Sequence, residues 1–294
     1  MQKLFSILLL TVFLLSGCSA QKEAPIKLVA NSWIGYSPLF YAKEKGWLEP
    51  LNIEVSTVVS LGESMMTYRT GRFDGLAGTQ YEYQKLNDQN QRLVPVLMFD
   101  RSNGGDMVMG NRSISQLQET VDTIDVYLEV NSINSMVFHD FIEAHQLEGK
   151  TFNYINKDQL KIVTQIKQKD QQAPALITTY VPYNFELSEL GFNTLASTKE
   201  VTDIVVLDAL YVTEKKLKHN LQTFLELKKV INQALLDLQQ DPESYYDLVK
   251  PYLENMSYQE FQASLGDIEW LTETIPRPLI EKINQVNFPI KDLL

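Results

Sequence analysis

An aromatic pair stands in the turn after the first β-rich run, where side chains could recognise a small molecule. Trp33, Tyr36 and Ser37 follow Ile26–Ala30 and precede a helical pattern that opens with Pro38. Proline suits the first turn of a helix, because the N–H group that it lacks would have no partner there. An indole and a phenol in such a turn can stack on a planar or methylene-bearing ligand and can also hydrogen-bond it. The alternative is that both rings simply fill the core.

Two later turns offer polar groups in corresponding places. Glu63 and Ser64 follow the second β-rich run, and Thr79 and Gln80 follow the third. Exposed backbone N–H groups in such turns can receive an anionic group of a ligand. Ordinary helix capping explains Ser64 and Thr79 equally well, so both interpretations stay open.

Carboxylates occur at positions where a ligand cation would meet them. Glu129 ends a β-rich run beside Asn131 and Ser132, so these polar groups should face a cleft. Asp208 lies inside an apolar run and, if charged, must be paired or hydrogen-bonded. The alternative partners are solvent for Glu129 and a backbone N–H for Asp208. Together with Glu63, these carboxylates favour a cationic, zwitterionic or nitrogen-heterocyclic ligand over a bare anion.

Other kinds of chemistry find no support in the sequence. His139 and Glu143 are helical neighbours, but the HExxH order and a third ligand are missing, so we expect no metal site. No G-x-S-x-G, P-loop or G-x-G-x-x-G spacing occurs, and we expect neither catalysis nor a cofactor. The 294 residues carry 37 acidic and 26 basic side chains, a formal net charge of -11, with no Lys/Arg run. This balance argues against nucleic acid and against anionic lipid surfaces as partners.

The amino end has the pattern of a lipoprotein signal peptide. After Lys3 an apolar run extends from Leu4 to Leu15, which is shorter than the roughly 20 residues that span a bilayer. Ser16 and Gly17 precede the single cysteine, Cys18, as in the bacterial lipobox. We therefore expect residues 1–17 to be removed, Cys18 to be acylated, with palmitate among the chains, and residues 18–25 to form a tether. An ordinary signal peptide that happens to contain a cysteine is the alternative.

The remaining chain alternates strand and helix patterns, which predicts an α/β fold with mainly parallel sheets. After about Thr213 the strand signal stops, and 215–240 reads as one long helix that ends at Asp241-Pro242. Helical patterns elsewhere include 38–45, 64–70 and 135–144. The predicted strands are 26–30, 53–59, 73–77, 94–99, 123–130, 175–180 and 204–212.

One stretch carries a resemblance to a known family. Asn31–Leu48 reads N-S-W-I-G-Y-S-P-L-F-Y-A-K-E-K-G-W-L, and it is followed by Leu51–Val55 and by Gly71–Thr79. The order and spacing of these segments resemble the periplasmic binding proteins for nitrate, taurine, alkanesulfonates and thiamine-pyrimidine precursors. The resemblance covers about 55 residues and concerns the fold more than the ligand.

The resemblance implies a two-lobed, type II binding-protein fold whose lobes are joined by two crossings. Lobe 1 would take 26–102 and 209–294, lobe 2 would take 103–208, and the crossings would lie near 102–105 and 207–210. The ligand would lie between the lobes, at the carboxyl ends of the strands. Ser102 and Asn103 would contact the ligand at the first crossing, and Tyr180 and Tyr183 would form a second aromatic wall.

The resemblance also implies a role. We expect a monomeric, lipid-anchored protein on the periplasmic or extracellular side of the envelope that passes a small polar molecule to the permease of an ABC importer. Closure about the crossings would signal occupancy to the membrane partner. The alternative is a ligand sensor that reports to a membrane histidine kinase or cyclic-dinucleotide enzyme.

Overall fold

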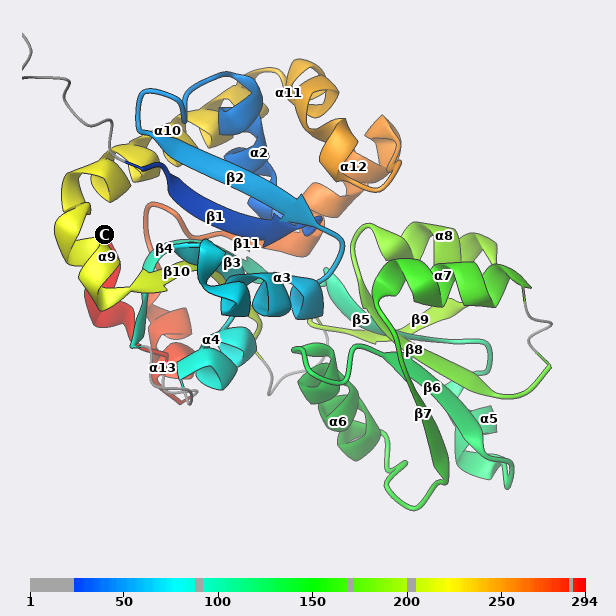
Figure 1. The fold of residues 1–294 in the computed structure, drawn as a ribbon. Helices are drawn as coiled ribbons and strands as arrows, with labels where there is room; N and C mark the ends of the chain where they lie inside the picture. The colour runs from blue at the N-terminus through cyan, green and yellow to red at the C-terminus, as the bar shows by residue number, and fades with distance from the viewer. Residues whose placement is uncertain (1–23, 88–91, 169–171, 200–204, 286–287) are drawn as a thin grey trace, which may run out of the picture.

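The computed structural model describes residues 24–87, 92–168, 172–199, 205–285 and 288–294 (Figure 1). The predicted signal peptide, Cys18 and the start of the predicted 204–212 strand therefore lie outside the described residues. No helix of the described ranges is long and apolar enough to cross a membrane.

The first of two sheets has six strands in the order β11-β4-β10-β3-β1-β2. β1 pairs in parallel with β2 and β3, whereas β10 pairs antiparallel with β3 and β4, and β11 antiparallel with β4. The strands are β1 (Ile26–Asn31), β2 (Ile53–Val58), β3 (Gly75–Thr79), β4 (Leu93–Ser102), β10 (Leu207–Thr213) and β11 (Ile268–Trp270).

Helices cover both faces of this sheet, so its central strands are almost continuously apolar. One face packs on α2, α10 and α11, where the Tyr41 and Tyr245 rings stack at 4.3 Å, and the other on α3, α4 and α13. The helices are α2 (Ser37–Glu44), α3 (Leu61–Thr67), α4 (Gln80–Asn87), α9 (Glu214–His219), α10 (Leu221–Gln240), α11 (Pro242–Val249), α12 (Tyr258–Ser264) and α13 (Arg277–Gln285). Short turns of 3-10 or π type lie at Ile34–Tyr36, Tyr68–Arg72, Lys250–Tyr252, Leu265–Asp267 and Ile290–Asp292.

The second sheet has five strands in the order β7-β6-β8-β5-β9. α7 and α8 lie on one of its faces and α5 and α6 on the other (Figure 1). Its strands are β5 (Asp106–Gly110), β6 (Ile124–Leu128), β7 (Phe152–Asn156), β8 (Ala175–Tyr180) and β9 (Asn193–Ser197). Its helices are α5 (Ile114–Glu119), α6 (Asn134–Ala144), α7 (Gln159–Gln168) and α8 (Tyr183–Glu189).

The predicted α/β class is confirmed, but both sheets are mixed where mainly parallel sheets were expected. The reason is the route of the chain between the sheets. β5, the first strand after β4, runs antiparallel to β8 and β9, and β10, the first strand after β9, runs antiparallel to β3 and β4. A parallel core of three strands remains in each sheet.

Three further sequence predictions were wrong in detail. Strands β5, β7, β9 and β11 were not predicted, because β7 and β9 are edge strands with exposed residues, β11 has 3 residues, and β5 is a short methionine-containing run. The strand signal does not stop at Thr213, since β11 completes the first sheet. The predicted 215–240 helix is two helices, separated at Asn220, whose φ of -124° is not helical.

The chain passes between the sheets twice, and the two passages are hydrogen-bonded to each other. Ser102 Oγ and Thr198 Oγ1 lie 2.8 Å apart, and the Gly104 N–H donates to the same Thr198 oxygen at 2.8 Å. Gly104 has a φ of +127°, a conformation that favours glycine. The second passage joins β9 to β10 and includes residues 200–204, which lie outside the described ranges, while residues 207–210, where we predict the crossing, are the first residues of β10.

Candidate functional site

A small cavity lies where strand ends from both sheets meet. Its volume is about 10 Å³, room for roughly one water molecule. Four of the sequence-predicted residues line it, namely Trp33, Thr79, Tyr180 and Asp208, and the remaining lining residues are Asn31, Leu61 and Asp106. The first sheet supplies Asn31, Thr79 and Asp208, and the second supplies Asp106 and Tyr180.

Carboxylates are concentrated around this cavity without cations. The buried charged side chains of the described chain are Glu82, Asp100, Asp106, Glu129 and Asp208, and no lysine or arginine is buried with them. Among the described residues, none of these carboxylates forms an ion pair. Buried carboxylates without a counter-charge are costly, so this arrangement needs a functional explanation.

Two of the acids are forced together by strand pairing. Asp208 on β10 lies directly opposite Asp100 on β4 and opposite Thr79 on β3. Like charges opposite each other destabilise a sheet. Burial raises the pKa of Asp208 and that of Asp100 well above their usual range, and the Asp100 charge raises the pKa of Asp208 further. Neutralisation by a proton or by a bound cation relieves this repulsion.

Burial also raises the pKa of Asp106 and that of Glu129 to about 7. Ser102 Oγ, which hydrogen-bonds Asp106, partly offsets the effect at Asp106, and the Gly62 N–H does so at Glu129. Both groups therefore titrate close to neutral pH, so the charge of the site is sensitive to pH and to any bound cation.

The Trp33 indole forms one wall of the cavity and joins the two sheets. Its Nε1–H donates to Asp100 Oδ1 at 3.2 Å, and its ring meets the Tyr180 ring edge-on, with centroids 6.2 Å apart. Gly105 permits this approach, since a Cβ there would lie 2.4 Å from the indole. Tyr36, predicted as its partner, does not line the cavity. Its hydroxyl donates to Asp208, and its ring packs edge-on against Phe99.

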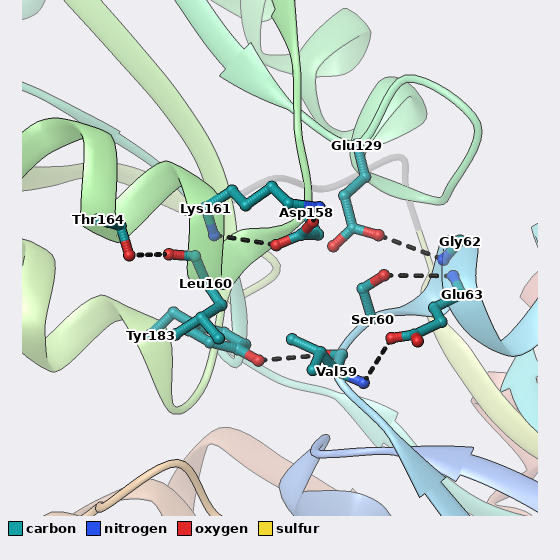
Figure 2. A network of polar contacts seen from close by, with 10 residues as sticks. All are labelled: Val59, Ser60, Gly62, Glu63, Glu129, Asp158, Leu160, Lys161, Thr164 and Tyr183. Carbon is teal, nitrogen blue, oxygen red and sulfur yellow. Dashed lines mark hydrogen bonds and ion pairs between the residues drawn. The ribbon is translucent and has the colours of Figure 1, made fainter.

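A chain of polar contacts leads from the cavity toward solvent. Asn31 Nδ2 donates to the Tyr180 hydroxyl at 3.3 Å, and that hydroxyl donates to Glu129 Oε1 at 3.3 Å. Glu129 Oε2 then accepts the Gly62 N–H at 3.2 Å (Figure 2). The Asn31 Oδ1 atom is buried without a hydrogen-bond partner, so it is free to accept from a ligand donor at the cavity.

Beyond Glu129 the space opens into a groove between α3 and the start of α7. The groove has a volume of about 860 Å³, and the predicted residues Glu63, Glu129 and Asn131 line it. Glu63 Oε2 accepts the Val59 N–H at 3.0 Å, and Lys161 pairs with Asp158 at 2.7 Å across the groove from it (Figure 2). Glu129 and Gly62 thus stand between the groove and the cavity.

Most of the other predicted site residues make polar contacts within the protein. Tyr245 donates to Ser37 Oγ at 3.1 Å inside the first core, and Ser64 is buried with no partner for its hydroxyl. Gln80 accepts the Leu207 N–H at 2.9 Å and donates to the Val205 carbonyl, which fixes the second passage. Four predicted residues remain. Asn103 accepts a hydrogen bond from Arg101, and Ser102 hydrogen-bonds Thr198 and the Asp106 N–H. Ser132 donates to the Glu129 carbonyl, and the Tyr183 hydroxyl donates to the Val59 carbonyl and lies 3.1 Å from Ser32 Oγ.

Sequence reasoning missed Asn31, Glu82, Asp100 and Asp106. Asp100 could have been found by the feature that identified Asp208, because it too is a carboxylate within an apolar run, Leu93–Ser102. Asn31 and Asp106 mark the end and the start of strands, but their meeting depends on how the two sheets face each other. Within the described ranges, no group of three or more His, Cys, Asp or Glu side chains is arranged to hold a metal ion.

Comparison with solved structures identifies the fold. The ligand-binding component of an ABC-type import system from Staphylococcus aureus, solved with zinc bound, matches with a TM-score of 0.70 and 15% identity over 92% of this chain and 96% of that one. The alkanesulfonate-binding protein from Xanthomonas axonopodis pv. citri bound to MOPS matches with a TM-score of 0.67 and 10% identity over 92% and 99%. A desulfurization enzyme also matches, with a TM-score of 0.62 and 11% identity over 90% and 92%.

A scan against protein-family models and a search of curated proteins find no match. The structural likeness extends over nearly the whole of both chains. The fold predicted from the segments between Asn31 and Thr79 is therefore confirmed: the chain has the fold of the periplasmic binding proteins.

Proposed function

We propose that this protein is an extracytoplasmic solute-binding protein that delivers a small polar molecule to an ABC importer. The observation that carries the proposal is the meeting of carboxylates from both sheets at one cavity, with no lysine or arginine buried in the described part of the chain. The likeness to binding components of ABC-type import systems supports the same role. The residues around the cavity serve to bind and release, and the protein catalyses no reaction.

The ligand in this proposal carries a positively charged or strongly hydrogen-bond-donating nitrogen group. Asp106 and Asp208 would accept from that group, and the unpartnered Asn31 Oδ1 would accept a further N–H. Trp33 and Tyr180 would surround its apolar part. A bare anion would meet uncompensated carboxylates, which disfavours nitrate-like or sulfonate-like ligands.

The proposal includes two lobes and a lipid anchor. Lobe 1 would comprise 26–102 and 209–294 and lobe 2 would comprise 103–208, so that the ligand lies between them. Residues 1–17 would be cleaved and Cys18 acylated, which holds the body at the membrane beside its permease. Cys18→Ser should abolish acyl labelling, and an equally labelled membrane-bound product from this variant would refute the anchor.

A second candidate is a sensor that reports occupancy to a membrane kinase or cyclic-dinucleotide enzyme. The same interlobe ligand site would serve it, because the closure of a binding protein can signal as well as deliver. Genes for an ATPase and a permease beside this one would favour import, and a sensor gene would favour reporting.

A thermal-shift screen tests the proposed function directly. The protein would be screened against amines, amino acids, pyrimidines, sulfonates and phosphonates. At a hundredfold excess over Kd, a ligand adds about 2.7 kcal/mol of stability, which raises Tm by several degrees in a protein of this size. Stabilisation by a nitrogenous cation or zwitterion supports the proposal. Stabilisation by sulfonates alone would overturn the ligand class, and no stabilisation by any small molecule would count against a binding protein.

A further inference from the structure

Two buried glutamates reach between the sheets in opposite directions. Glu82 lies on α4 beside the first sheet, and its Oε1 accepts the N–H of Ile133 at the start of α6, beside the second sheet, at 3.3 Å. Glu129 follows β6 of the second sheet, and its Oε2 accepts the N–H of Gly62 at the start of α3, beside the first sheet, at 3.2 Å. Each carboxylate therefore lies beside one sheet and accepts an N–H group at the amino end of a helix beside the other sheet.

Glu82 is held so that one of its oxygens points across the interface. Its Oε2 accepts both the N–H and the hydroxyl of Thr79, with an N···O distance of 2.9 Å for the N–H. On the opposite side, Ile133 precedes α6 and has no side-chain cap of its own. Because the first N–H groups of a helix have no partner within it, the Glu82 carboxylate supplies an acceptor that the second sheet does not.

Glu129 mirrors this arrangement. Its Oε1 accepts from the Tyr180 hydroxyl at 3.3 Å, which leaves Oε2 for Gly62. The local cap of α3, Ser60, accepts the Glu63 N–H at 3.2 Å and not that of Gly62 (Figure 2). Both contacts end on the turn 129–133, which the Ser132 hydroxyl fixes by donating to the Glu129 carbonyl at 2.9 Å.

We propose that these two contacts form a reciprocal clasp that favours the closed arrangement of the two sheets and must open before a ligand enters or leaves. Glu129 and Gly62 line the open groove, whereas the cavity behind them holds about 10 Å³. A ligand larger than a water molecule therefore needs the sheets to separate. Glu82 and Glu129 are the positioning residues that set the cost of this separation. The inference rests on the proposed function for what enters, but the clasp itself is testable without any ligand.

Distance measurements on the full chain test the clasp. Met66 on α3 and Leu160 on α7 are 69% and 43% exposed and line the groove from opposite sides. Met66→Cys and Leu160→Cys, in a Cys18→Ser background purified in detergent, would carry spin labels for pulsed electron paramagnetic resonance. Both Glu82 oxygens accept N–H groups, so Glu82→Gln must place its amide NH₂ against one of them. We expect this variant to raise the open population roughly tenfold, the effect of losing about 1.4 kcal/mol.

The Glu129 variants provide an internal control. Glu129→Ala removes the contact and should also open the protein. Glu129→Gln can still accept from Gly62 while its NH₂ group donates to the Tyr180 oxygen, so its distances should match those of the parent. Glu143→Gln, an exposed position on α6, should also leave the distances unchanged.

Several outcomes would overturn the clasp. Unchanged distances in both Glu82→Gln and Glu129→Ala would do so, provided that circular dichroism shows both variants folded. Equal opening by Glu129→Gln and Glu129→Ala would refute the hydrogen-bond geometry. An opened Glu82→Gln variant in a protein that binds no solute would support the clasp and still defeat the proposed function, so the two can fail separately.

Discussion

At the scale of single residues, Trp33 combines two roles that phenylalanine cannot replace. Its ring fills the space beside Gly105, and its Nε1–H is the hydrogen-bond donor that reaches Asp100 Oδ1. The other oxygen of Asp100 is buried without a partner. Sequence reasoning placed Trp33 at the site because of its turn, but its bond to Asp100 depends on a strand 67 residues further along the chain.

Trp33→Phe should lower the free energy of unfolding by about 1–3 kcal/mol, because it leaves the buried Asp100 carboxyl without its donor. Chemical denaturation would measure the change. Trp47→Phe, at a half-buried indole outside the site, is the matched control and should cost less. An equal loss in both variants would mean that indole volume alone stabilises the protein.

Asp208 should show opposite effects on stability and on binding. Asp208→Asn removes a buried acid whose pKa is raised while keeping an acceptor for Tyr36, so the ligand-free protein at pH 8 should become more stable. Binding of the cation found by the screen should weaken at least tenfold, because the amide keeps the shape and loses the charge. Calorimetric titration and thermal melts would measure both. Asp122→Asn, at an exposed acid, should change neither, and tighter binding by Asp208→Asn would refute the cationic ligand.

At the scale of elements, most buried strands could be predicted and most edge strands could not, although the short buried strand β5 was missed and the edge strand β2 was predicted. β8 and β3 are buried throughout and read as apolar runs, whereas β7 has only exposed and half-buried residues and reads as polar. Trp33 and Thr79 were predicted because a turn after a strand is a recognisable place in sequence. Asp208 was predicted from the apolar run around it, and Tyr180 from the family resemblance. Asn31 and Asp106 were missed because the way in which two sheets face each other leaves no local sequence signal.

The Gln80 side chain joins α4 to the second passage and should be sensitive to shortening. Gln80→Ala would leave both the Leu207 N–H and the Val205 carbonyl without partners. We expect a loss of about 1–3 kcal/mol in stability and faster hydrogen exchange at the Leu207 amide. Gln118→Ala, at an exposed position on α5, is the control. Unchanged exchange at Leu207 would show that other contacts fix the passage.

At the scale of the whole molecule, the buried acids should give the ligand-free protein an unusual dependence on pH. The pKa of Asp106 is raised from 3.8 to about 7, and that of Glu129 from 4.5 to about 7. Between about pH 4 and 7 the folded chain keeps protons that the unfolded chain releases, so stability falls as pH rises through this window. At about 1.4 kcal/mol per pKa unit, the two groups together should lower the stability by several kcal/mol.

Denaturation in urea at half-unit steps from pH 5 to 8 would measure this slope. Glu129→Gln cannot titrate at that position and should flatten the curve. A stability that rises steadily over the same range in the parent protein would contradict the raised pKa values.

Because the acidic cavity is buried, added salt should act differently on the association and on the dissociation of a cation. The Debye length is about 8 Å at physiological ionic strength, and screening acts strongly on exposed charges but weakly on buried ones. Under the proposed function, a cation approaching a protein of net charge -11 would be drawn by a long-range field that added salt weakens, so its association would slow. A cation bound between Asp106 and Asp208 would be out of reach of mobile ions. Its residence time would then be set by the contacts around it and would be the same at low and at high salt.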